Sequence, residues 1–130
     1  MSLLLDTHVW LWWTSGEERR FPQRVRRRIA DPGERVAVSI ASLWELAIKA
    51  SLGRLSVPRS PASYALDQLK RQRFDLLELK VKHLDAVAAL PPHHRDPFDR
   101  LLIAQAQVEP LTIVTADRAF RAYDVAKIVF

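Results

Sequence analysis

Acidic residues stand at four places in the chain where carboxylates can do chemistry. Asp6 follows the apolar run SLLL directly, and Asp117 comes just after TIVT. Glu45 lies one or two helical turns beyond VAVS, and Asp99 lies near the start of the apolar stretch LLIAQA. Clustered carboxylates raise each other's pKa unless a cation is present, so four acids at one place would indicate a metal site.

The elements that must position these acids are predicted by the pattern of apolar residues. Short buried-type runs predict strands, and apolar residues at helical spacing predict helices. Strands are expected at 2–6, 35–39, 75–79, 111–117 and 125–130, and helices at 21–30, 42–53, 60–73, 80–90 and from residue 96 onward. The segment HVWLWW after Asp6 fits a strand or a short helix equally well.

The order of these elements, β-α-α-β-α-α-β-α-α-β-α-β, predicts the fold class. It is typical of a three-layer α/β domain with a mainly parallel central sheet of five strands flanked by helices. No repeat or internal linker interrupts the order, so we expect residues 1–130 to form a single domain. In open parallel sheets the ligand site lies beyond the carboxyl ends of the strands, which is where all four acids are expected to meet.

Two of the acids are expected to face the protein interior. On a helical wheel Asp99 shares a side with Leu102 and Ile103. Glu45 belongs to a helix that is apolar almost all round, where an ionised carboxylate is costly unless it is paired or binds a metal. Lys49, four residues after Glu45, is the available ion-pair partner and the main argument for a structural role of this acid.

Each acid also has a purely structural explanation. Ser42 and Glu45 have the spacing of a capping box, and Asp96, followed by proline, has the form of a helix N-cap. Asp6 and Asp117 are suited to cap the segments that follow them. Capping explains each acid singly, but it does not explain why all of them are placed where strand ends meet.

The bulk composition is that of a globular, basic protein. The 130 residues are 48% hydrophobic and 27% charged, with a net charge of +5, a balance that favours polyanionic partners such as nucleic acid. The absence of cysteine excludes disulfides and thiolate ligands and fits a reducing compartment. No apolar run approaches the about 20 residues of a membrane-spanning helix, and the N-terminus lacks a basic leader. We therefore expect a soluble, cytoplasmic protein without a membrane partner.

The donor types indicate which metal the acids would bind. Oxygen ligands without cysteine, and without histidine at a recognisable zinc spacing, suit Mg²⁺ or Mn²⁺. Such an ion can activate a water molecule for in-line attack on a phosphodiester and stabilise charge on the phosphoryl oxygens. An acidic metal pocket on a basic protein is what nuclease chemistry needs, because arginines and lysines hold the backbone while the acids hold the ion.

Four motifs carry a resemblance to a known family. The segments LLLDTHVWLWW, VSIASLWELAIKASLGRL, HHRDPFDRLLIAQA and LTIVTAD resemble, in order and separation, those of PIN-domain ribonucleases of the VapC toxin type. The resemblance spans nearly the whole chain. It implies a five-stranded parallel sheet, Mg²⁺-dependent endoribonuclease activity on RNA, frequent homodimerisation, and inhibition by a cognate VapB-type antitoxin.

The resemblance also assigns roles to individual residues. The family's catalytic acids fall on Asp6, Glu45, Asp99 and Asp117, with Asp6, Asp99 and Asp117 as the metal ligands. Asp96 is interpreted as a cap that adds negative charge beside Asp99, and the alternative is that Asp96 is itself a ligand.

Small polar residues beside the acids are candidates for supporting roles. Thr7, Ser42 and Thr115 are suited to orient a water molecule or a carboxylate, although local capping would place the same residue types there. Lys49 either pairs with Glu45 or faces phosphate. Some branches of the family carry a further acid where this chain has Ala119, which leaves one metal ion or two as alternatives.

A different class of function remains open on the sequence alone. A basic nucleic-acid-binding module without catalysis would use the same arginines and would need its acids only as helix caps. The tryptophans lie in apolar runs and are expected in the core or at a protein interface rather than as base-stacking platforms. His93 and His94, in the loop PPHHR, are expected at the surface, and the alternative is that this loop, beside the site, contacts RNA.

Overall fold

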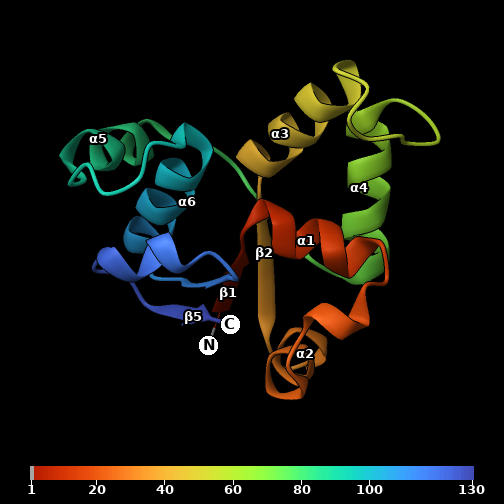
Figure 1. Ribbon diagram of the computed structural model, residues 1–130, viewed down its shortest axis with the longest axis horizontal. Coiled ribbons are helices and arrows are strands. Elements are labelled where there is room, and N and C mark those ends of the chain that lie inside the picture. Colours follow the sequence, from red (N-terminus) through yellow and green to blue (C-terminus); the bar gives the residue numbers. More distant parts are fainter. Residues whose placement is uncertain (1) are drawn as a thin grey trace.

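A parallel five-stranded sheet forms the centre of the computed structural model, which describes residues 2–130 (Figure 1). Its strands pair in the order β3-β2-β1-β4-β5, and every pairing is parallel. The strands are β1 (Ser2–Leu5), β2 (Arg35–Ser39), β3 (Asp75–Leu77), β4 (Thr112–Thr115) and β5 (Lys127–Val129). The predicted three-layer α/β fold with a five-stranded sheet is confirmed.

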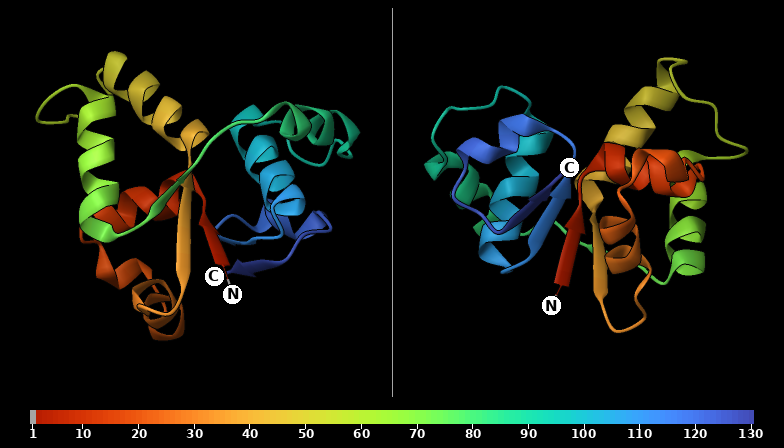
Figure 2. Two further views of the ribbon diagram at one scale, coloured as in Figure 1. Left: turned by 180° about the vertical axis from the view of Figure 1, so that it is seen from behind. Right: turned by 60° about the horizontal axis from the view of Figure 1, so that its bottom comes forward.

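Helices cover both faces of this sheet (Figures 1 and 2). One layer holds α1 (Thr7–Thr14), α2 (Gln23–Ala30), α3 (Ile40–Ser51) and α4 (Pro61–Gln72). The other holds α5 (Val81–Ala89) and α6 (Pro97–Val108), with the 3₁₀ helix η2 (Arg118–Ala122) between β4 and β5. A second 3₁₀ helix, η1 (Glu18–Arg20), links α1 to α2.

The alternation of side chains along the strands divides the core into two halves. Leu3 and Leu5 of β1 pack in the cluster that contains α1, α2, α3 and α4, whereas Leu4 packs in the cluster with α6. All three leucines are fully buried. Successive strand residues point to opposite faces, so an uninterrupted apolar run is what a strand covered on both faces requires.

Two segments show how local sequence sets the helices. Residues 7–14 form a helix because the Asp6 side chain accepts a hydrogen bond from the Val9 N–H and so caps it. This settles the ambiguity of HVWLWW in favour of helix. The predicted stripe of α2 is confirmed, because Val25 and Ile29 are buried, whereas the arginines around them are exposed or only half-buried.

The start of α3 differs from the prediction. The helix begins at Ile40, and Ser39 is its N-cap, with its hydroxyl accepting from the Ala41 N–H. Ser42 therefore lies inside the helix, and the proposed capping box of Ser42 and Glu45 is wrong. The interpretation failed because VAVS runs straight into the helix without the polar linker that would mark a boundary.

The strand order creates a topological switch point at one place along the sheet. From β1 the chain builds β2 and then β3 on one side, and it then crosses through α5 and α6 to place β4 on the other side of β1. The direction of winding thus reverses between β1 and β4, and ligands of open α/β sheets bind at such a switch point. Asp6 directly follows β1, and Asp117 lies two residues after the end of β4. Within residues 2–130, no helix has the length and apolar character to cross a membrane.

Candidate active site

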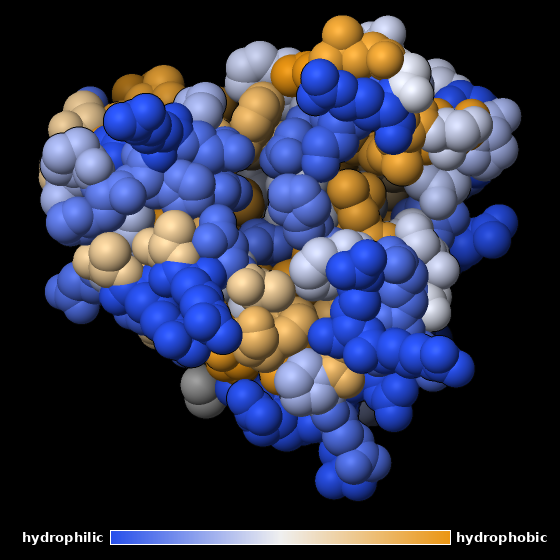
Figure 3. All heavy atoms as spheres, in the orientation of Figure 1, coloured by the Kyte–Doolittle hydropathy of each residue, from blue (hydrophilic) through white to orange (hydrophobic). Residues whose placement is uncertain are grey.

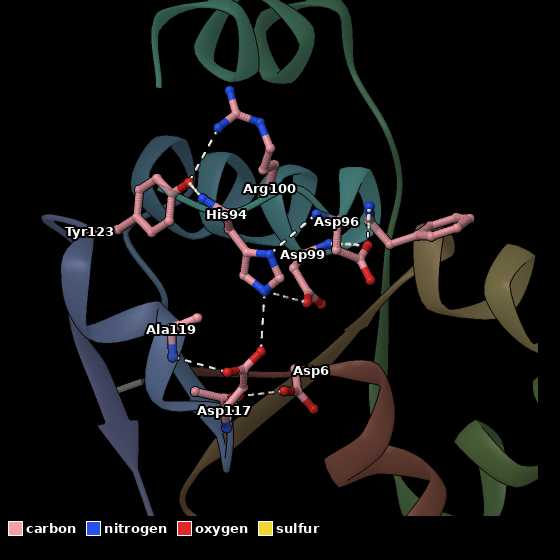
Figure 4. A network of polar contacts seen from close by, with 10 residues as sticks. Asp6, His94, Asp96, Asp99, Arg100, Asp117, Ala119 and Tyr123 are labelled. Atoms are coloured by element: carbon pink, nitrogen blue, oxygen red, sulfur yellow. Dashed lines mark hydrogen bonds and ion pairs between the residues drawn. The ribbon is translucent and has the colours of Figure 1, made fainter. Parts of the chain in front are cut away.

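Three carboxylates from three elements converge at the switch point (Figure 4). Asp6 extends from the end of β1, Asp117 from the turn after β4, and Asp99 from the first turn of α6, and Figure 4 shows the three side chains near one another at this end of the sheet. One oxygen each of Asp99 and Asp117 lies with a His94 ring nitrogen in a group whose atoms are all within 4.8 Å of one another. Of the four acids expected to meet, Asp99 and Asp117 lie in this group, and the charges of Asp6 and Glu45 are near enough to raise the pKa of Asp99.

Asp6 is the most firmly held of these acids. Its Oδ1 accepts the Val9 N–H at 2.9 Å, and its Oδ2 accepts the Thr115 hydroxyl at 2.5 Å. Burial raises the pKa of Asp6, and the hydrogen bonds from Thr115 and Val9 lower it in part. Thr115 therefore orients a carboxylate, which is one of the two supporting roles expected for it.

Asp99 owes its position to the cap of its own helix. Asp96 accepts the N–H groups of Phe98 and Asp99 through Oδ1, at 2.8 and 3.2 Å, as predicted for an N-cap followed by proline. Burial, and after it the charges of Asp96 and Asp6, raises the pKa of Asp99 to about 7. Because Asp96 Oδ1 accepts both of these backbone N–H groups, the structure favours the cap interpretation of Asp96.

Asp117 combines capping with an inward-facing oxygen. Its Oδ1 accepts the Ala119 N–H at 2.9 Å and so caps η2, while its own N–H donates to Thr115 Oγ1. Its Oδ2 remains directed at the space shared with Asp99 (Figure 4). Capping and ligand binding are therefore compatible in Asp117, because each uses a different oxygen.

Glu45 belongs to α3, which packs in the other half of the core from η2. Its Oε2 lies 3.4 Å from Lys49 Nζ, so the expected ion pair is present. Its Oε1 is buried and, among the described residues, has no hydrogen-bond partner. The charge of Glu45 also raises the pKa of Asp99, which places the two carboxylates within electrostatic reach. An unpaired buried carboxylate oxygen is costly, and a cation would relieve that cost.

Thr7 and Ser42 form a hydrogen bond with each other. Their hydroxyl oxygens lie 2.8 Å apart, and both residues are buried. The bond joins the start of α1 to α3, and thereby links the segment after Asp6 to the helix that carries Glu45. This contact fixes the two helices relative to each other, and orientation of a water molecule by either hydroxyl stays a prediction.

His94 is a site residue that the sequence analysis missed. Its Nε2 lies 3.0 Å from Asp99 Oδ2 and 3.1 Å from Asp117 Oδ2. The loop is held in place because the His94 N–H donates to the Tyr123 hydroxyl at 2.7 Å, and Arg100 donates to the same hydroxyl. The expectation of a surface histidine was wrong because residues distant in sequence fix this loop, which leaves no local pattern to detect.

The hydrogen bonds of the ring define which nitrogen of His94 carries the proton. The Asp96 backbone N–H donates to Nδ1 at 3.2 Å, and a backbone amide is always a donor. Nδ1 is therefore the acceptor, and Nε2 bears the hydrogen that it directs at Asp99 and Asp117. In this tautomer the ring is a donor to the two carboxylates and not a metal ligand.

The residues at this site fit a divalent cation. The donors are carboxylate oxygens, two of the acids have pKa values raised by burial, and Glu45 keeps an orphaned buried oxygen. A hard cation with oxygen ligands would remove the repulsion and the desolvation cost together. The arrangement is also open to a substrate, because a hollow of 240 Å³ adjoins Asp6 and Asp117.

A parallel α/β sheet with acidic side chains at its switch point is typical of a class of nuclease domains. The chain belongs to the PIN-domain family, whose model matches residues 3–126. One relative, Ribonuclease VapC22 of Mycobacterium tuberculosis, is 32% identical over 122 residues, which cover 94% of this chain and 92% of the relative.

Solved structures share the whole architecture at low identity. VapBC2 from Rickettsia felis, bound to a DNA fragment from its promoter, matches with a TM-score of 0.75 at 15% identity, over 100% of this chain and 99% of that one. DNA-bound VapBC from Salmonella typhimurium matches with a TM-score of 0.72 at 18% identity, over 99% and 98% of the two chains. These structures support the fold assignment.

Proposed function

We propose that this chain is an endoribonuclease toxin that hydrolyses RNA phosphodiester bonds with a bound divalent metal, Mg²⁺ with Mn²⁺ as the alternative. The observation that carries the proposal is the group formed by Asp99, Asp117 and His94 at the switch point of the sheet, with the Asp6 carboxylate close enough to raise the pKa of Asp99 (Figure 4). The net charge of +5 suits a polyanionic substrate. The relationship to a protein named as a ribonuclease supports RNA as that substrate.

Each acid has a distinct part in this proposal. Asp6, Asp99 and Asp117 would hold the ion, and Glu45 adds a fourth negative charge from α3. When bound, the ion would supply activation of water and neutralisation of charge on the phosphoryl group. Thr115 keeps Asp6 in one orientation, and Asp96 holds the first turn of α6, so the carboxylates are placed before any ligand arrives.

An antitoxin is the proposed protein partner. The solved structures with this fold include complexes titled toxin–antitoxin or VapBC, which suggests a VapB-type partner for this chain. A groove of 610 Å³ between α3 and α4 is lined mainly by small and apolar side chains, among them Ala47, Ala50, Leu55 and Val57. Figure 3 shows hydrophobic side chains at the top of the molecule, where α3 lies, and Leu52 of the turn after this helix is 60% exposed.

We also propose a domain organisation and an oligomeric state for the protein. Residues 1–130 would act as a single PIN domain in the cytoplasm, and homodimerisation remains a prediction. Sedimentation of the purified chain, alone and with its antitoxin, would give both stoichiometries.

Cleavage of RNA under controlled metal conditions tests the proposal. Antitoxin-free protein is incubated with a structured RNA pool in Mg²⁺, in Mn²⁺ or in EDTA, and the products are resolved on a gel. We expect cleavage in either ion and none in EDTA. RNA binding that is indifferent to metal, without cleavage, would favour the alternative of a basic binding module whose acids are helix caps.

A further inference from the structure

The hollow beside the acids has a second wall that the proposed chemistry does not use. It is lined by Asp6 and Asp117 together with His8, Trp12 and Ala116. The two acids belong to the metal site, whereas His8 and Trp12 are aromatic side chains of α1. One small cavity therefore joins the proposed reaction centre to a pair of rings.

The two rings are adjacent and differ in exposure. His8 and Trp12 lie one helical turn apart, with ring centroids separated by 6.3 Å and planes inclined by 48°. His8 is exposed, and Trp12 is half-buried. The other tryptophans of α1 are used elsewhere, since Trp10 is fully buried and Trp13 packs against Phe21 and Phe74.

Trp12 is held in place by its neighbours. Phe21 meets its ring edge-on at a centroid distance of 6.4 Å, and the Arg20 guanidinium lies 4.6 Å from the ring centroid. A ring that is already fixed loses little conformational entropy when a ligand stacks on it. The cavity of 240 Å³ is below the roughly 300–1,000 Å³ of pockets for drug-sized ligands, so it suits one ring system.

We propose that this hollow is a subsite for an unpaired nucleobase, which stacks on Trp12 when the neighbouring phosphate lies at Asp6 and Asp117. The inference rests on the proposed ribonuclease function and specifies how that site takes its substrate. A base is uncharged and has a π-face, so it suits a hollow that has an aromatic wall and acids beside it. The enzyme would therefore select RNA whose target nucleotide is free of a duplex, and stacking would accept more than one base.

A double-mutant cycle between protein and RNA tests the subsite. Wild type and Trp12→Leu are assayed on a short single-stranded RNA and on versions in which one nucleotide at a time lacks its base. Loss of the stacked base is expected to lower wild-type kcat/KM by roughly 5- to 150-fold. Trp12→Leu should lower kcat/KM on the intact RNA by a similar factor. On the RNA that lacks the stacked base, Trp12→Leu should lower kcat/KM little further, because both changes remove the same contact.

Controls separate stacking from folding. Trp13→Leu removes an equally large ring from the same helix outside the hollow. Because Trp13 contacts Phe21, this variant measures the effect of weakened packing, which should lower kcat/KM by the same factor on the intact RNA and on RNA that lacks the base. Trp12→Phe keeps a smaller ring and should fall between wild type and Trp12→Leu, with all variants checked by circular dichroism. Independent, multiplying losses, or Trp12→Leu cleavage equal to wild type on every RNA, would overturn the subsite.

A binding measurement distinguishes the two proposals. The same RNA set is titrated into wild type and Trp12→Leu in EDTA, where no cleavage is expected. If wild type fails to cleave in metal, the ribonuclease proposal fails, while weaker binding of only the base-containing RNA by Trp12→Leu still supports the subsite. Equal RNA binding by the two proteins, with loss of antitoxin binding in Trp12→Leu, would assign the ring to the protein partner and overturn the subsite.

Discussion

His94 Nε2 lies 3.0 Å from Asp99 Oδ2, so a loop histidine donates into the cluster of acids that would hold the metal. The same nitrogen reaches Asp117 at 3.1 Å, and the ring therefore bridges two carboxylates from different elements (Figure 4). Since the other ring nitrogen accepts from a backbone amide, the bridge is an N–H donor. An arriving cation would have to replace this donor at both acids.

Removing the imidazole should strengthen metal binding. In His94→Ala the ion no longer competes with the N–H for Asp99 and Asp117, and a hydrogen bond to a charged group is worth enough to change affinity by about tenfold. Titration calorimetry with Mn²⁺ on the two proteins measures the difference. Weaker binding by His94→Ala would instead identify the ring as a ligand and would contradict the tautomer that the hydrogen bonds define.

Asp99 should make the metal-free protein less stable as the pH rises. Its pKa is 3.8 in an unfolded chain and about 7 when folded, so the folded state holds this proton more tightly. The contribution to stability is complete below 3.8 and is lost as the pH rises through about 7. Asp99→Asn, which cannot ionise, should raise the free energy of unfolding above that range by roughly 1 to 3 kcal/mol.

Denaturant unfolding in EDTA across this pH range shows whether the stability contributed by Asp99 falls as the pH rises. The advantage of Asp99→Asn should shrink as the pH falls toward 3.8. Added Mn²⁺ should stabilise wild type more than Asp99→Asn, because an ion that binds only the folded state adds to its stability. An advantage that stays constant with pH would show that the carboxylate is not under electrostatic strain.

Glu45 and Lys49 allow the structural and functional roles of an acid to be separated. Lys49→Met should destabilise the metal-free protein by about 1 to 3 kcal/mol, because it leaves the buried Glu45 carboxylate without its ion-pair partner. Glu45→Gln combined with Lys49→Met should recover most of that loss. Thermal unfolding of wild type, Lys49→Met, Glu45→Gln and the double variant completes the cycle. If the stability losses of the two single variants add up to that of the double variant, the pair is not coupled.

The sequence predicts the layers of this fold well, because its strands are buried on both faces. Runs such as LLL and VAV need no partner information to be recognised, and the stripe of Val25 and Ile29 identifies α2. The order of the strands is not contained in such runs. Only the crossover through α5 and α6 places β4 beside β1, and this pairing brings Asp117 close to Asp6.

The positions of the acids could be predicted because the apolar pattern locates the ends of the strands and helices. The residues that contact the acids could not be predicted in this way. Asp6, Asp99 and Asp117 stand at element ends, which the pattern locates to within a residue or two. His94 and Tyr123 meet through a loop, and the contact of Thr7 with Ser42 crosses between helices. Such contacts depend on tertiary packing, and spacing along one chain does not report them.

Cleavage of RNA by wild type, Asp99→Asn and Asp85→Asn tests the central claim most directly. Asp85 is an exposed acid of α5, so its variant makes the same chemical change outside the site. With antitoxin removed and folding verified, we predict Mg²⁺-dependent cleavage by wild type and Asp85→Asn, and at least a hundredfold loss, on the order of a lost catalytic group, in Asp99→Asn. Cleavage by Asp99→Asn at the wild-type rate, or cleavage that persists in EDTA, would contradict a metal-dependent site built on this acid.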